Sequence, residues 1–367
     1  MSGAASFPAA VHTIVVGAGT AGCVVAGRLA ANNSQTVLLL EAGPDYGPAA
    51  SGRWPRELLD ATKVASTHDW GYTGEFGGRV IHFGRARVVG GCSAHNAGAV
   101  VHGSRSDYDG WAAAGNAGWS ARELAPLFAA AWKQLRVRRV ARRAGPCPRR
   151  PGGGRGRARR SGADGNPRVA GSAVRWRLRY PRDCSARCRA GSDLHVYPVG
   201  GGTGKDPSNW YWFLGVACLT PLSRGSVRLT GPGPDDKLLI DHRYLSDPDG
   251  SDRARLAEGV ERVCAVARAP ELRRLLGRRT RPGPVVTGRQ AIERFIDHAA
   301  VHYYHPAGSC KMGPAGDPDS VADAAGRVHG IEDLYAADAS LMPAVTSGNT
   351  NMPVTVIGER IAQSLLA

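Results

Sequence analysis

The stretch that decides the fold is VVGAGTAG, residues 15–22. It contains the pattern G-x-G-x-x-G as Gly17, Gly19 and Gly22, which is a weak signal on its own. The β-branched run HTIVV precedes the pattern, small residues typical of a closely packed helix follow it, and a second apolar run, TVLLLEAG, comes next. This order predicts a strand, a glycine turn, a helix and a second strand, which is the first unit of a parallel α/β sheet.

An acidic residue completes this pattern, because Glu41 ends the second predicted strand 19 residues after Gly22. In such a context the glycines allow the backbone to approach a pyrophosphate, the helix N-terminus stabilises its charge, and the acid accepts from a ribose hydroxyl. The alternative is an ordinary glycine turn, but the strand, the helix and the acid favour a dinucleotide site. The residues expected to bind it are Gly17, Gly19, Thr20, Ala21, Gly22 and Glu41. The fingerprint does not distinguish a nicotinamide from a flavin nucleotide.

The net charge of +16 over 367 residues raises the question of a nucleic-acid partner. Residues 136–189 contain 18 arginines and only two acids, Asp164 and Asp183, so this segment carries the whole imbalance. Its Arg, Gly, Pro and Ala cannot bury enough apolar area to form a packed core, so we expect it to be disordered or poorly packed. A nucleic-acid arm is one interpretation, but aromatic residues are sparse and no recognition module adjoins it. The same composition would arise from GC-rich codons read out of frame, which is the hypothesis that we favour. We therefore expect no nucleic acid as a partner.

At 367 residues the chain is long enough for a large core, and its length alone favours two domains over one. We find no apolar run long enough for a membrane span and no secretory signal pattern, so we expect a cytoplasmic protein. The eight cysteines are scattered and make no disulfide framework. The closest pair, Cys184 and Cys188, has no partner at zinc spacing, so we expect no metal site.

The chain outside the arginine-rich segment alternates between predicted helices and short strands. Residues 106–135 read as two helical pieces, the second beginning with a capping box formed by Ser120 and Glu123. Four short apolar runs between 193 and 245 are typical of an antiparallel sheet. The helices predicted after them are two amphipathic segments at 247–277 and 288–300 and a terminal helix from Asn351, and a strand is predicted near 330–340.

A second glycine-containing turn, VVGGCSAHNAG at residues 88–98, places His95 and Asn96 where no helix or strand can bury them. Either these side chains cap a turn, or they contact a group that is not protein.

Five blocks of the sequence together resemble the glucose–methanol–choline (GMC) family of flavin oxidoreductases. The blocks are GRARVVGGCSAHNAG with DYDGW, YYHPAGSCKMG, VADAAGRVHGIEDLYAADASLMP and SGNTNMPVTVIGERIA, beside the glycine fingerprint. They match in order and spacing over about residues 11–135 and 193–367, and they are most similar to choline oxidase- and choline dehydrogenase-type members. The family's second signature, similar to G…SP…LL…SGIGP, is missing from the middle of this sequence.

The resemblance implies an α/β fold, with a Rossmann-like FAD-binding domain built from both chain ends and a substrate domain on an antiparallel sheet. We accordingly expect residues 1–135 to form the first part of the FAD-binding domain and 136–190 to be an arginine-rich irregular segment. Residues 191–305 would form the substrate domain, and residues 306–367 the C-terminal part of the FAD-binding domain.

The resemblance also implies the site residues, with His305 and Asn349 as the catalytic pair. An imidazole titrates in the range needed to take an alcohol proton, and an amide can orient the same oxygen. The further FAD contacts that it implies are Gly90, Gly91, His95, Asn96, Ala97, Asp338, Ala339, Asn351, Met352 and Pro353. In choline oxidase-type members the residue matching His95 is bonded to the 8α-methyl of the flavin, so His95 is either such a tether or a non-covalent contact.

The function implied is FAD-dependent oxidation of an alcohol by proton abstraction and hydride transfer to the flavin. The partner is then a small-molecule alcohol, whose identity the sequence does not reveal, and the electron acceptor is unknown. The alternative is a degenerate, truncated member of the family with impaired FAD binding and no activity.

Overall fold

The computed structural model describes residues 10–32, 35–60, 64–134, 193–202, 210–233 and 236–367. Contacts along the chain group residues 1–133 and 190–367 into one compact unit and residues 134–189 into a second. The architecture below is that of the first unit. The predicted irregular segment 136–190, including Cys184 and Cys188, lies outside the described residues.

The glycine fingerprint forms the strand–helix–strand unit that the sequence predicts. Strand β1 (Thr13–Val16) leads into helix α1 (Thr20–Ala30), and β2 (Val37–Leu40) pairs with β1 in parallel. Gly17 has a φ of +92°, which favours glycine. A Cβ atom at Gly22 would lie 1.9 Å from the carbonyl oxygen of Gly17, so only glycine lets α1 begin this close to the turn.

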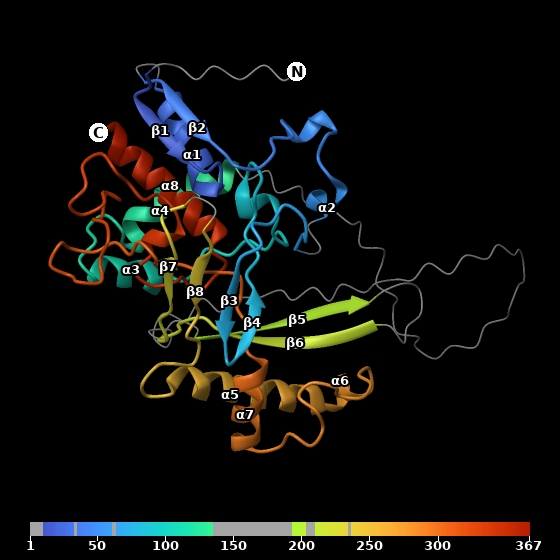
Figure 1. The fold of residues 1–367 in the computed structure, drawn as a ribbon. Coiled ribbons are helices and arrows are strands. Elements are labelled where there is room, and N and C mark those ends of the chain that lie inside the picture. Colours follow the sequence, from blue (N-terminus) through green and yellow to red (C-terminus); the bar gives the residue numbers. More distant parts are fainter. Residues whose placement is uncertain (1–9, 33–34, 61–63, 135–192, 203–209, 234–235) are drawn as a thin grey trace, which may run out of the picture. The chain divides into compact units, whose positions relative to one another are not determined.

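The last helix of the chain packs against the first. Helix α8 (Asn351–Leu366) lies along α1, as Figure 1 shows. A Cβ at Gly358 would be 3.1 Å from the Ala21 carbonyl oxygen, so glycine lets the two helices approach closely. Arg28 donates from Nε and Nη2 to the two carboxylate oxygens of Glu359, each at 2.7 Å. Both ends of the chain therefore build one Rossmann-like unit, as predicted.

A second sheet contains four strands in the order β4-β3-β8-β7. These are β3 (Thr73–Phe76), β4 (Arg79–His82), β7 (Ser226–Leu229) and β8 (Leu238–Asp241). The β3–β4 and β7–β8 pairs are antiparallel, whereas β3 meets β8 in parallel at Glu75 and Asp241. The sheet thus joins a hairpin from the first part of the chain to two strands from beyond residue 191.

A separate antiparallel ribbon is formed by β5 (Leu194–Gly202) and β6 (Trp210–Cys218). The four strands predicted between 193 and 245 are all present, but they divide between this ribbon and the four-stranded sheet. The strand predicted near 330–340 is reduced to one antiparallel bridge between Arg327 and Tyr335, followed by a short 3₁₀ turn, Ala339–Leu341.

Helix α5 (Ser251–Arg268) covers the ribbon and packs on α7 (Arg289–Ala299). Ala257, Ile292 and Ile296 form the buried centre of this packing. The short helices α2 (Arg56–Leu59) and α6 (Pro270–Arg273) lie between longer elements of the chain. Among the described residues, no helix is both long and apolar enough to span a bilayer.

Helices α3 (Arg105–Ala113) and α4 (Ala121–Gln134) are the two predicted helical pieces. The predicted capping box at the start of α4 is confirmed, because Glu123 accepts from the backbone and hydroxyl of Ser120, whose hydroxyl accepts from the Glu123 N–H. Buried Trp111 on α3 donates its indole N–H to the Ala344 carbonyl at 2.9 Å. Helix α3 thereby contacts a loop more than two hundred residues further along the chain.

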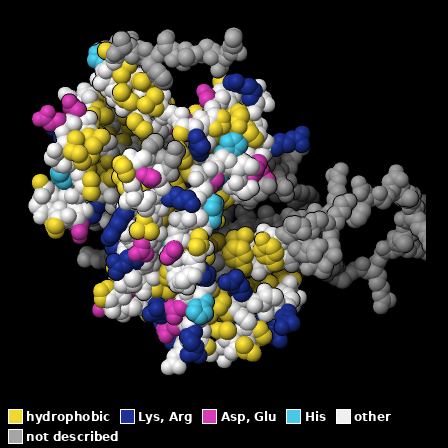
Figure 2. Space-filling view, in the orientation of Figure 1, with side chains coloured by type: hydrophobic (Ala, Val, Ile, Leu, Met, Phe, Trp, Pro, Cys, Tyr) yellow, Lys and Arg dark blue, Asp and Glu magenta, His cyan; other side chains and the backbone are white. Residues whose placement is uncertain are grey.

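One apolar surface stays open on the Rossmann-like unit. In Figure 2, hydrophobic side chains gather over the β1–β2 pair, where Ile14 and Val16 are 56% and 81% exposed. The cleft described next begins at the same pair, since both strands contribute to its lining.

Candidate active site

One continuous cleft in the first unit brings together residues from both parts of the chain. Fifteen of the eighteen predicted site residues line it: Gly17, Gly19, Thr20, Ala21, Gly22, Glu41, Gly91, His95, Asn96, Ala97, His305, Asp338, Ala339, Asn349 and Asn351. Gly90, Met352 and Pro353 do not line it. Met352 and Pro353 are instead buried in the packing of α8, so their side chains are directed into the protein.

The Glu41 carboxylate fixes the fingerprint turn. One oxygen accepts from the Ala18 N–H and the other from the Gly43 N–H, both at 2.8 Å. The Gly17 N–H donates to the Leu40 carbonyl at 2.8 Å, which closes the turn against β2. Each carboxylate oxygen has a second acceptor site, so Glu41 can still receive a ribose hydroxyl.

The space beside the fingerprint fits a pyrophosphate. A Cβ at Gly19 would lie more than 4 Å from every described residue outside its own turn, so open space lies against the backbone that a cofactor would approach. In the part of the chain that the structure describes, no side chain caps the N-terminus of α1, so its first N–H groups are free to bind an anion. The 88–98 turn closes the other side, because a Cβ at Gly91 would lie 2.8 Å from the Gly19 Cα. These residues therefore fit a dinucleotide cofactor.

Within that turn, the Asn96 side chain has a hydrogen-bond partner, whereas one ring nitrogen of His95 has none among the described residues. Asn96 accepts through Oδ1 from the Gly98 N–H at 2.7 Å, so it caps the turn while also lining the cleft. His95 is only 5% exposed, and its Nε2 has no hydrogen-bond partner among the described residues. Burial lowers the pKa of His95 and the nearby Asp69 carboxylate opposes this. His95 lines the cleft, so this buried ring nitrogen lacks a hydrogen bond that a group bound in the cleft could supply.

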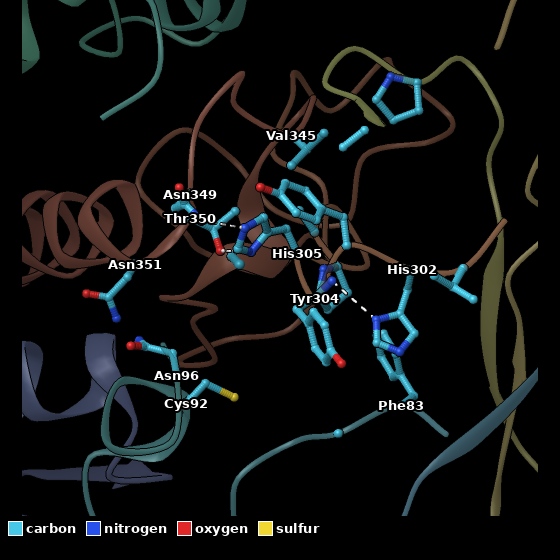
Figure 3. Close-up of a pocket in the computed structure, with 18 of the residues that line it drawn as sticks. Phe83, Cys92, Asn96, His302, Tyr304, His305, Val345, Asn349, Thr350 and Asn351 are labelled. Carbon is cyan, nitrogen blue, oxygen red and sulfur yellow. Dashed lines mark hydrogen bonds between the residues drawn. The ribbon is translucent and has the colours of Figure 1, made fainter. Parts of the chain in front are cut away.

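The predicted catalytic pair is in direct contact. The Asn349 amide nitrogen lies 3.0 Å from His305 Nε2, and the Thr350 hydroxyl lies 3.3 Å from His305 Nδ1. Because an amide nitrogen only donates, Nε2 accepts and carries the lone pair, while Nδ1 carries the hydrogen and donates to Thr350. Figure 3 shows the imidazole facing these two side chains, which follow each other on one loop.

The surroundings keep this imidazole neutral. Burial, together with the smaller effect of the positive charge of Arg85, lowers the pKa of His305 to about 4. Arg85 is close because its Nη2 donates to the carbonyl of Tyr304, the residue before His305, at 3.1 Å. A neutral imidazole at physiological pH can accept a proton.

Aromatic side chains form the wall next to His305. The Tyr303 ring stands edge-on to the imidazole with centroids 5.1 Å apart, and the Tyr303 hydroxyl lies 2.9 Å from His195 Nδ1. Further along, Phe83 packs edge-on against His302, with centroids 5.3 Å apart. The lining beside the catalytic pair is therefore largely aromatic, which suits the carbon skeleton of an organic substrate.

Asp338 has a local structural role as well as a place in the cleft. Its carboxylate accepts from the Ser340 N–H at 2.9 Å and caps the 3₁₀ turn Ala339–Leu341. The Ala339 carbonyl accepts from Gly308 at 3.1 Å, so this turn supports the loop that follows His305.

Sequence reasoning missed Thr350, Tyr303 and Arg85. Thr350 stands between two residues that were singled out, and Arg85 lies within the quoted block GRARVV. The contacts of Arg85 and Thr350 with the His305 region come from tertiary packing. Tyr303 is local, and the aromatic pair YY before HPAG indicated a ring beside the imidazole.

Two family models match the chain, both described as GMC oxidoreductase, over residues 11–149 and 221–358. The chain belongs to the GMC oxidoreductase family. It is 38% identical to oxygen-dependent choline dehydrogenase 1 of Chromohalobacter salexigens over 150 residues, which is 41% of this chain and 26% of that protein. It is also 38% identical to an alcohol dehydrogenase [acceptor] of Pseudomonas putida over 153 residues, 42% of this chain and 27% of that one. The match thus spans about a quarter of the length of each of these relatives.

Solved structures share the fold. A formate oxidase of Aspergillus oryzae RIB40 (the R554K variant) superposes with a TM-score of 0.71 at 15% identity, covering 98% of this chain and 99% of that one. A FAD-dependent oxidoreductase of Chaetomium thermophilum superposes with a TM-score of 0.66 at 17% identity, covering 97% and 99%. These likenesses confirm the predicted fold class.

Proposed function

We propose that this chain is a FAD-dependent oxidoreductase that oxidises the CH–OH group of a small alcohol. The observation that carries the proposal is the contact between His305 and Asn349 in the same cleft as the glycine fingerprint. The family supports it, and the relatives include proteins named choline dehydrogenase and alcohol dehydrogenase.

The catalytic pair would act on the hydroxyl group. An alcohol oxygen that replaces the direct hydrogen bond between the two side chains would accept from the Asn349 amide and donate its hydrogen to His305 Nε2. As the C–H bond breaks, Nε2 takes the hydroxyl proton, and Thr350 holds the ring orientation through Nδ1. FAD, when bound, supplies the ring that accepts the hydride. The substrate leaves as a carbonyl compound, having lost one proton and one hydride.

The residues that would hold FAD lie around the other end of the cleft. The backbone at Gly17, Gly19 and Gly22 would receive the pyrophosphate, and Glu41 a ribose hydroxyl. Asn96 and His95 would lie against the cofactor from the 88–98 turn. The first turn of α8, at Asn351, would direct its positive end toward the cofactor and favour negative charge on the flavin.

The test is reduction of the bound flavin by an added alcohol under anaerobic conditions. The reduction is monitored as the loss of the visible absorbance of the flavin. Anaerobic conditions make the result independent of the electron acceptor. Aliphatic alcohols, aromatic alcohols and choline should be tried, and at least one should reduce the flavin of the wild type. His305→Ala should slow this reduction about a hundredfold or more, as loss of a positioned acid/base group does.

The matched control is His298→Ala, which removes an exposed imidazole on α7 that does not line the cleft. It should leave the reduction rate unchanged. FAD binding without reduction by any alcohol would contradict the proposed activity, and an unchanged rate in His305→Ala would contradict the role of that residue. Absence of FAD binding in the wild type would favour the degenerate alternative.

A further inference from the structure

The N-terminus of α3 is tied to the loop that carries Asn349. One carboxylate oxygen of Asp107, Oδ2, accepts from the Ser347 N–H at 2.9 Å and from the Ser347 hydroxyl at 2.8 Å. The same oxygen accepts from the Ser104 N–H at 2.7 Å, which is half of the α3 capping box. A single carboxylate thus joins a helix terminus to a loop 240 residues away.

The contact continues on both sides of Ser347. A Cβ at Gly348 would lie 2.6 Å from the Gly103 nitrogen, so the 346–350 loop runs directly against the residues before α3. Four residues before Gly348, the Ala344 carbonyl accepts from the Trp111 indole on α3. The loop is therefore anchored on α3 both before and at Ser347, immediately ahead of the two side chains that contact His305.

Hydrogen bonds to a carboxylate are stronger than neutral ones, and three donors on one oxygen fix its position. Asn349 and Thr350 follow Ser347 by two and three residues and hold opposite nitrogens of the His305 ring. A small displacement of the loop at Ser347 would therefore move both partners of the imidazole together.

We propose that Asp107 is a positioning residue for alcohol oxidation, because it fixes the loop that presents Asn349 and Thr350 to His305. The inference rests on the proposed function of the same site. Asp107 does not line the cleft and touches no reacting atom, so its effect on the reaction passes through the loop.

This role predicts a change in the chemistry of His305 that a purely structural helix cap would not cause. A loosened loop admits water beside the imidazole, and burial is the main cause of its low pKa. We call the two hydrogen bonds from Ser347 to Asp107 the tie. When the tie is broken, the pKa of His305 should move back toward its ordinary value.

Three variants separate the tie from the cap. Ser347→Ala removes one bond of the tie and leaves the capping box whole, whereas Ser104→Ala removes the capping hydroxyl and leaves the tie whole. Asp107→Asn weakens both. Each variant would be loaded with FAD and compared with the wild type in anaerobic flavin reduction from pH 4 to 8, and the imidazole titration of His305 would be followed by NMR, assigned with His305→Ala.

In Asp107→Asn, flavin reduction should slow about tenfold, and in Ser347→Ala about threefold, as expected for lost hydrogen bonds. In both, His305 should titrate at a higher pH than in the wild type. Ser104→Ala should keep the wild-type rate within about twofold and the wild-type titration. If Asp107→Asn does not fold or hold FAD, Ser347→Ala decides the question.

A wild-type rate and a wild-type His305 titration in Ser347→Ala and in folded Asp107→Asn would overturn the inference. Equal effects in Ser104→Ala would overturn it too, because they would assign the change to the helix cap. Failure of the proposed function has a different signature, since no alcohol would then reduce the wild-type flavin. The NMR titration, which needs no turnover, still tests the tie in that case.

Discussion

Burial of His305 should make the folded protein sensitive to acid in a way that one substitution can isolate. The folded-state pKa of His305 is about 4, against an ordinary value of 6.5. Between these values the unfolded chain binds a proton that the folded chain does not, so stability rises with pH in this window. The contribution of His305 is complete above pH 6.5 and is lost as the pH falls toward 4.

The size of the effect follows from the two pKa values. Lowering the pH from 7.5 to 5 should cost the wild type about 2 kcal/mol through this single group, increasing to about 3 kcal/mol at pH 4. His305→Gln has no such group, because its amide does not titrate. Other titrating groups are common to both proteins and cancel in the comparison.

The assay is urea unfolding of the wild type and His305→Gln at pH 7.5 and pH 5. The wild type should lose about 2 kcal/mol more of its unfolding free energy than the variant between the two pH values. A difference below about 0.5 kcal/mol would refute the reasoning, since the imidazole would then be equally easy to protonate in the folded and unfolded chains.

Three further predictions concern the rest of the cleft and its support. Gly19→Val should abolish FAD binding, because its side chain would occupy the space the pyrophosphate needs, and full flavin occupancy after purification would contradict this. Arg28→Ala should lower the free energy of unfolding by about 2 kcal/mol, because it leaves the Glu359 carboxylate, which is 8% exposed, without its partner. The control Arg262→Ala, which breaks an exposed ion pair, should lower it by less than about 1 kcal/mol. Both are measured by thermal or urea unfolding. Acid precipitation of the holoprotein should leave yellow colour in the pellet if His95 tethers the flavin, and His95→Ala should then release it; colour fully in the supernatant of the wild type would make His95 a non-covalent neighbour.

The parts of the fold that the sequence predicts well are those determined by local rules. The turn at Gly17 needs a positive φ, α1 needs small residues, and the capping box at Ser120 is a four-residue pattern, so each can be recognised from a short stretch of sequence. Helix α8 was likewise predicted from a local signal, since Pro353 lies near its first turn.

The parts that sequence reasoning missed depend on partners far along the chain. The β3–β4 hairpin, TGEFGGRVIH, shows no clean alternation, and its place in the sheet comes from pairing with β8, about 160 residues later. Asp107 reads locally as a helix-cap residue, and its bonds to Ser347 emerge only in the folded chain. Tertiary contact, which no local pattern encodes, determines both.

The pairing of the first and last helices has a consequence for how the protein is made. Synthesis releases α1 well before α8 and the loop with Asn349, so the Arg28 side chain is made 331 residues ahead of its partner Glu359. Closing so long a loop is entropically costly and slow, so the nascent chain exposes the apolar surface of α1 that packs on α8 until α8 has been made. A ribosome stalled before codon 351 would therefore hold a chain whose fingerprint turn is complete in sequence but lacks its supporting helix. Such a chain is a natural target for chaperones.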